Sequence, residues 1–81
     1  MKKIYESPLN GWDESAERVH VYALESDKEF FELDEMDFDE RCEVFGVWEE
    51  NYVAPGAMYH KYSFCLEGNH MIITERIAYN V

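Results

Sequence analysis

The sequence predicts an α+β fold: a small single domain over residues 1–81, dominated by an antiparallel β-sheet with a C-terminal hairpin and one short helix. Three observations predict it. Two long alternating segments flank a glycine-first loop near the C-terminus, which is typical of a β-hairpin. A serine followed three residues later by a glutamate marks a helix start. Turn-forming residues divide the rest into short segments. An all-β fold, as a small barrel or meander, is the open alternative.

The N-terminal part is predicted to hold two strands. Lys2 to Tyr5 favours a short strand that ends before Pro8, and Leu9 to Trp12 is predicted to be a loop because its Asn-Gly pair is a strong turn signal. Arg18 to Leu24 favours a strand, since its alternating valines suit extended backbone. Asp13 to Ala23 could alternatively form a helix, so this segment has two interpretations.

The central part is predicted to contain the short helix and one further extended segment. Ser26 and Glu29 have the spacing of a capping box, and the helix should run from Asp27 to about Glu35. The rival interpretation is a turn at the serine that leads into a strand. Arg41 to Trp48 is predicted to be extended, and residues 54–56 (Ala-Pro-Gly) break the chain.

The C-terminal third allows the most detailed prediction. Met58 to Leu66 and Met71 to Tyr79 flank Gly68-Asn69, and glycine in the first position is what a type II′ turn requires. The turn fixes the register of the two strands. The pairs expected on the face that packs on the core are Leu66–Met71, Phe64–Ile73, His60–Ile77 and Met58–Tyr79. Only the pair Tyr62–Glu75 interrupts the apolar character of that face.

The other face of the hairpin should be more solvated, and it contains one unfavourable pair. Lys61 and Arg76 are expected to lie directly opposite each other, where like charges are destabilising. Two explanations stay open. Either a carboxylate from the acidic part of the chain lies over both side chains, or both extend into water.

The charge of the chain is concentrated in one segment. The formal net charge is -11, and residues 25–50 hold twelve acidic residues against only Lys28 and Arg41. The remaining residues are almost neutral. Aromatic and aliphatic residues are interleaved with the acids, which distinguishes this segment from a disordered acidic tail. We therefore expect it to fold and to display its carboxylates on a fixed backbone.

The sequence lacks the motifs of catalysis, cofactor binding and metal binding. It has no glycine-rich nucleotide-binding loop, and its histidines and cysteines lack the close ligand spacing of a zinc site. Asp37 to Arg41 starts like a calcium loop, but the arginine occupies the place of the third ligand. We therefore predict that the protein is not an enzyme and has no catalytic residues, no cofactor and no metal site.

Location and partners are predicted from the same features. The lysines Lys2 and Lys3 are not followed by the apolar stretch of a signal peptide, and no apolar run reaches membrane-spanning length. Cys42 and Cys65 are too few for a disulfide-stabilised secreted miniprotein, so free thiols in a cytoplasmic protein are expected. We predict no membrane contact. We also predict no direct contact with nucleic acid, because phosphate binding needs a basic patch.

The leading hypothesis is a small acidic protein-binding module or inhibitor that occupies a basic surface of a partner, such as a nucleic-acid-binding protein. In its sharpest form the carboxylates imitate nucleic-acid phosphates. In size and charge only, the chain resembles the small acidic proteins of phages and mobile elements that block restriction or CRISPR nucleases. The residues expected to form this surface are Glu29, Glu32, Asp34, Glu35, Asp37, Asp39, Glu40, Glu43, Glu49 and Glu50.

The alternative hypothesis is a structural or regulatory subunit that binds through its aromatic and apolar surface, or a homodimer through an edge strand such as the last one. Trp12, Trp48, Tyr52 and Tyr59 are its candidate anchors, since tryptophan and tyrosine dominate binding hot spots. Without further information, such large aromatic residues are expected to lie in the core. The alternative for the acidic segment is a solvated face that only keeps the protein soluble.

Overall fold

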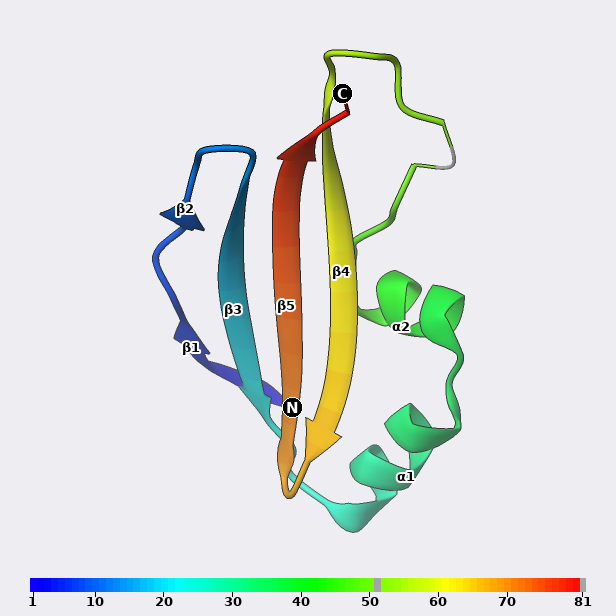
Figure 1. Cartoon of the computed structure of the whole chain (residues 1–81). Helices are drawn as coiled ribbons and strands as arrows, with labels where there is room; N and C mark the ends of the chain where they lie inside the picture. Colours follow the sequence, from blue (N-terminus) through cyan, green and yellow to red (C-terminus); the bar gives the residue numbers. More distant parts are fainter. Residues whose placement is uncertain (51, 81) are drawn as a thin grey trace.

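The computed structural model describes residues 1–50 and 52–80, which form a five-stranded antiparallel sheet and two short helices (Figure 1). The elements in chain order are β1 (Lys2–Glu6), β2 (Asn10–Gly11), β3 (Ser15–Ala23), α1 (Asp27–Glu35), α2 (Phe38–Phe45), β4 (Met58–Glu67) and β5 (His70–Tyr79). The strand order is β1-β3-β5-β4, and β2 also pairs with β3. The predicted α+β class is confirmed. The sheet is not closed into a barrel, and there are two helices where one was predicted.

The C-terminal hairpin has the predicted register, and every cross-strand pair expected on the core face is present. Met58 and Tyr79, the pair farthest from the turn, are nevertheless exposed, so the prediction that they pack on the core is wrong. Gly68 has a φ of 58°, and within the described residues only Trp12 combines a side chain with a positive φ. Asn69 therefore has a negative φ, as a type II′ turn requires. The carbonyl of Asn69 accepts a hydrogen bond from the N–H of Leu24 (2.7 Å), which ties the end of β3 to this turn.

β5 lies inside the sheet, between β3 and β4 (Figure 1). The prediction that the last strand offers a free edge for a homodimer is therefore wrong. One edge belongs to β1 and β2 and the other to β4, because the chain runs from β3 through both helices to β4 before β5 returns between β3 and β4.

The N-terminal part, up to Ala23, forms strands, as one of the two interpretations expected. The predicted first strand is β1, and β3 begins at Ser15, earlier than predicted. The helical alternative for Asp13 to Ala23 is wrong, because β3 pairs with β1 and β2 along one edge and with β5 along the other. The loop predicted for Leu9 to Trp12 contains the two residues of β2, and the turn comes later, where the N–H of Trp12 donates to the carbonyl of Ser15 (2.9 Å).

The first helix, α1, has the predicted bounds and N-cap. The Ser26 side chain accepts a hydrogen bond from the N–H of Glu29 (3.2 Å), so the turn-and-strand interpretation is wrong. The N-cap satisfies one of the donors that a helix start leaves without a partner.

The second helix, α2, replaces part of the extended segment predicted for Arg41 to Trp48. Asp37 and Glu40 form a full capping box, in which each side chain accepts the other's backbone N–H (2.8 and 3.4 Å). Gly46 ends the helix in the left-handed conformation, with a φ of 69°. The predicted extended segment is therefore wrong for Arg41 to Phe45, because the cap at Asp37 starts a helix there and the ring of Phe45 packs on Tyr22 from that helix. None of the helices in the described ranges has the length and apolar character needed to cross a membrane.

The core lies between the two helices and one face of the sheet. Its centre is Leu33 from α1, packed with Met71 and Ile73 from β5. The ring of Phe45 from α2 lies 5.0 Å from that of Tyr22 on β3, measured between centroids. The molecule is thin, with extents of 43 × 25 × 16 Å. Its radius of gyration of 13.9 Å exceeds the roughly 12 Å typical of a compact chain of this length.

Lys61 and Arg76 lie opposite each other as predicted, on the face of the sheet away from the helices. The acids of the helices therefore do not cover this pair, and within the described residues no carboxylate of residues 25–50 forms an ion pair with Lys61 or Arg76. Both side chains are exposed, which favours the explanation that they extend into water. Arg76 has Glu17 of β3 as its cross-strand partner on the other side. The ammonium of Lys61 lies 5.7 Å from the ring centroid of Tyr59. Both cations thus have favourable neighbours on their own face.

Candidate functional site

The helices present most of their carboxylates to solvent. α1 and α2 follow each other closely and cover the same face of the sheet (Figure 1). We define the acidic helix surface as the predicted binding residues that are exposed on this layer and on the segment after it: Glu32, Asp34, Glu35, Asp37, Asp39, Glu40, Glu43 and Glu50. The structure therefore brings most of the predicted binding residues together.

Glu29 and Glu49 differ from the others because they are half-buried and have internal partners. The carboxylate of Glu29 accepts a hydrogen bond from the amino group of Met1 (2.9 Å). That of Glu49 accepts one from the backbone N–H of Tyr62 (2.7 Å) on the edge strand β4. An exposed strand edge has unpaired backbone N–H groups that invite pairing with another chain. Glu49 accepts a hydrogen bond from one of these groups on β4. Both carboxylates therefore form hydrogen bonds within the fold. Their role in binding stays a prediction.

The two basic residues of the acidic segment neutralise little of its charge. Lys28 lies 3.8 Å from Glu32, but these side chains are 85% and 57% exposed, and such pairs are weak. Arg41 donates from Nε to the carbonyl of Leu33 (3.1 Å), which joins α2 to α1. The acidic helix surface therefore keeps its negative charge.

Large apolar side chains are exposed among the acids. Phe31 is 61% exposed, Val44 is 45% exposed, and Trp48 is 72% exposed. Of the aromatic anchors named by the alternative hypothesis, Trp12, Trp48 and Tyr52 are exposed and Tyr59 is half-buried. The default assignment of these residues to the core is thus wrong for the exposed ones, and the acidic helix surface is mixed rather than purely charged.

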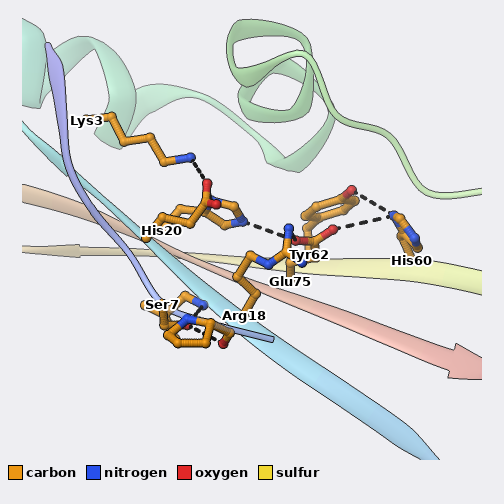
Figure 2. Close-up of polar contacts among 10 residues, drawn as sticks. Lys3, Ser7, Arg18, His20, His60, Tyr62 and Glu75 are labelled. Carbon is orange, nitrogen blue, oxygen red and sulfur yellow. Dashed lines mark hydrogen bonds and ion pairs between the residues drawn. The ribbon is translucent and has the colours of Figure 1, made fainter. Parts of the chain in front are cut away.

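A second group of ionisable residues surrounds Glu75 on the helix-covered face of the sheet (Figure 2). Glu75 is only 8% exposed. Its carboxylate lies 3.1 Å from Nε2 of His20, 3.6 Å from Nδ1 of His60 and 3.9 Å from Nη1 of Arg18. β3 and β4, which flank β5, supply these partners, and a buried carboxylate needs such partners on both sides.

The network reaches both edges of the sheet (Figure 2). Oε1 of Glu6 on β1 lies 3.2 Å from Nδ1 of His20, and the ion pair with Lys3 lowers the pKa of the Glu6 carboxyl below its ordinary value. On the β4 side, the hydroxyl of Tyr62 lies 3.3 Å from Nδ1 of His60, and burial raises the pKa of this tyrosine. The contacts thus link β1, β3, β5 and β4 into one unit.

This network was not identified from the sequence. The available signal was the pair Tyr62–Glu75 on a face predicted to be buried, together with His60 on the same face, because buried polar groups normally satisfy one another. The pairing of β3 with β5, which brings in Arg18 and His20, has no such local signal.

Within residues 1–50 and 52–80, no three His, Cys, Asp or Glu side chains are grouped so as to hold a metal ion. What the Glu75 network can do is fix the relative positions of four strands, since removing one member would leave a buried charge without a partner. Comparison of the chain with protein-family models, curated proteins and solved structures gives no match.

Proposed function

We propose that the protein is a small acidic binding module whose acidic helix surface occupies a basic surface of a partner protein. One observation carries the proposal: exposed carboxylates and exposed apolar side chains share one layer. A face that only keeps the protein soluble gains nothing from exposed Phe31, Val44 and Trp48. A protein interface uses both kinds of group, with aromatic anchors surrounded by polar residues.

The distribution of charge supports a basic partner. The twelve acidic residues between positions 25 and 50 repel one another, and this repulsion destabilises the folded state. A basic partner relieves this repulsion when it binds. Opposite charges also speed the association of the two proteins, and an acidic competitor would be repelled. The proposal includes a cytoplasmic location, which the two free thiols support.

A finer form of the proposal is an inhibitor that imitates nucleic-acid phosphates. Neighbouring carboxylates on one face of a helix are about 5–6 Å apart. A duplex has a phosphate every ~3.4 Å of axis on each strand, so the charge densities are of the same order. In this form the partner is a nucleic-acid-binding protein, and the module and the nucleic acid compete for one site.

The exposed aromatic residues support a second candidate, a subunit or homodimer held mainly by apolar contacts. Trp48 is 72% exposed and Tyr52 is 78% exposed. Apolar contacts respond weakly to salt, whereas contacts between charges weaken as salt screens them. The salt dependence of binding therefore separates the two candidates.

The test begins with capture of partners on the immobilised protein at low and high salt, followed by affinity measurements with the identified partner. The key variant keeps the capping residues Asp37 and Glu40 and changes four other acids to their amides: Asp34, Glu35, Asp39 and Glu43. We expect affinity at low salt to fall at least about tenfold and its salt dependence to flatten. Stability should hold or rise, because self-repulsion is relieved.

A matched control changes four exposed acids outside the surface to their amides: Asp13, Glu14, Glu17 and Glu67. The control should keep its affinity. Unchanged affinity of the helix variant would instead identify the surface as a solvated face. Binding that resists high salt and is lost in Trp48→Ala would favour the second candidate. Displacement of nucleic acid from the partner by the protein tests the phosphate-imitation form.

A further inference from the structure

A cavity of about 360 Å³ lies between β4 and the segment that follows α2. Its walls are formed mainly by Val47, Trp48, Glu50, Tyr59, His60 and Tyr62. Ligand sites in proteins span about 300–1,000 Å³, so this cavity suits one side chain rather than a large molecule. The groups it offers are aromatic rings and a carboxylate.

The electrostatics of the cavity favour a cation. Gly46 and Val47, the first residues after α2, both line it. The C-terminus of a helix carries partial negative charge, and α2 has no basic residue in its last turn to offset it. The carboxylate of Glu50 adds a full negative charge at the wall.

Two basic side chains stand near the cavity, and both have partners. Lys61 Nζ lies 5.7 Å from the ring centroid of Tyr59, so this ring already attracts a cation. Nδ1 of His60 lies 3.3 Å from the hydroxyl of Tyr62 and 3.6 Å from the carboxylate of Glu75. Neither base forms an ion pair with Glu50 in the described part of the chain.

We propose that this cavity binds the guanidinium group of an arginine side chain from the basic partner. The inference rests on the proposed function and names the chemistry of one anchor. Arginine fits better than lysine, because its planar group stacks on aromatic rings and forms paired hydrogen bonds to a carboxylate, whereas an ammonium is compact and strongly hydrated. Bound arginine would cover Trp48, which is otherwise 72% exposed.

The experiment titrates the ¹⁵N-labelled protein with N-acetyl-arginine amide and follows backbone and indole N–H signals by NMR. The neutral isostere N-acetyl-citrulline amide and tetramethylammonium are comparison probes. We expect saturable shifts at Gly46, Trp48 and Tyr59 with the arginine probe. Binding of the citrulline probe should be at least about fivefold weaker, since it lacks the charge.

Matched variants assign the site. Trp48→Ala and Glu50→Gln should each weaken binding of the arginine probe about three- to tenfold. Trp12→Ala and Glu43→Gln remove an exposed tryptophan and an exposed acid elsewhere, and they should leave binding unchanged. Far-UV circular dichroism of each variant checks that the fold is intact.

The outcomes separate this inference from the proposed function. Equal effects of Glu43→Gln and Glu50→Gln, or tighter binding of tetramethylammonium than of arginine, would overturn the arginine site. Partner binding that persists while the arginine probe produces no shift would overturn the cavity assignment and leave the proposed function standing. Saturable arginine binding in a protein whose captured partner lacks a basic surface would support the cavity and contradict the proposed function.

Discussion

Glu75 in the sheet and the carboxylates of the helices differ in what surrounds them. Glu75 is 8% exposed, and His20, His60 and Arg18 lie within 3.9 Å of its carboxylate. The acids of the acidic helix surface are exposed and face water. Charges interact strongly where water is excluded and weakly where it is present. The same type of residue therefore holds the fold together in the sheet and is available for binding on the helices.

The largest expected effect tests the sheet side of this comparison. Glu75→Gln removes the charge but keeps the shape, and it takes away the carboxylate that Arg18, His20 and His60 share. Because this position is buried, we expect the free energy of unfolding to fall by about 2–3 kcal/mol. Urea denaturation measures it. Glu67→Gln, on an exposed glutamate at the end of β4, should have no effect. Coincident midpoints for the two variants would contradict a structural role for the network.

The next effect concerns the turn that sets the register of β4 against β5. Gly68→Val should cost about 1–2 kcal/mol, since a side chain there resists the positive φ of 58°. An added Cβ would meet no atom within 4 Å, so the cost is conformational rather than steric. His70→Ala, at the exposed start of β5, should change stability by less than about 0.5 kcal/mol. Equal denaturation midpoints would refute the type II′ assignment.

A third variant sharpens the comparison within the helix layer. Asp37→Ala removes the N-cap of α2 and should lower stability by about 1 kcal/mol. Asp34→Asn, at an exposed position inside α1, should leave stability equal or slightly higher, because it relieves repulsion. Thermal unfolding followed by circular dichroism compares the two. If both lower stability equally, the exposed acids are structural and the contrast with Glu75 fails.

The smallest effect is a dependence of stability on alkaline pH. Burial raises the pKa of the Cys42 thiol above its ordinary value of 9.0, helped by the carboxylates of Glu49 and Asp39. The folded state holds this proton more tightly than the unfolded chain. The stabilisation is therefore fully present below pH 9.0 and is lost as the pH rises through the folded-state pKa.

We expect the loss to stay below about 1 kcal/mol between pH 8 and pH 10.5. Urea denaturation across that range measures it, and Cys42→Ala should partly flatten the curve, since Tyr62 and the amino group of Met1 also have raised pKa values and still titrate there. Cys65→Ala, on the exposed face, should leave the curve as in the unmodified protein. If Cys65→Ala flattened the curve and Cys42→Ala did not, the pH dependence would belong to Cys65 and not to Cys42.

The accuracy of the sequence-based predictions varies with how local the determining contacts are. The register of β4 and β5 follows from the two residues of their turn, and α1 follows from Ser26 and Glu29. The same kind of signal, Asp37 with Glu40, precedes α2, although Arg41 to Trp48 was predicted to be extended. Strand propensity depends on context, and here the ring of Phe45 packs on the sheet from a helix.

The turn, the first helix cap and the concentration of negative charge in one segment can all be predicted from the sequence, because each depends on residues close along the chain. The packing of distant segments, in contrast, set β3 beside β5, which places Glu75 between Arg18 and His60. It also decided that Trp48 stays exposed beside the end of α2. The pairing of distant strands and the burial of a side chain depend on contacts between residues far apart in the chain, which local patterns do not specify.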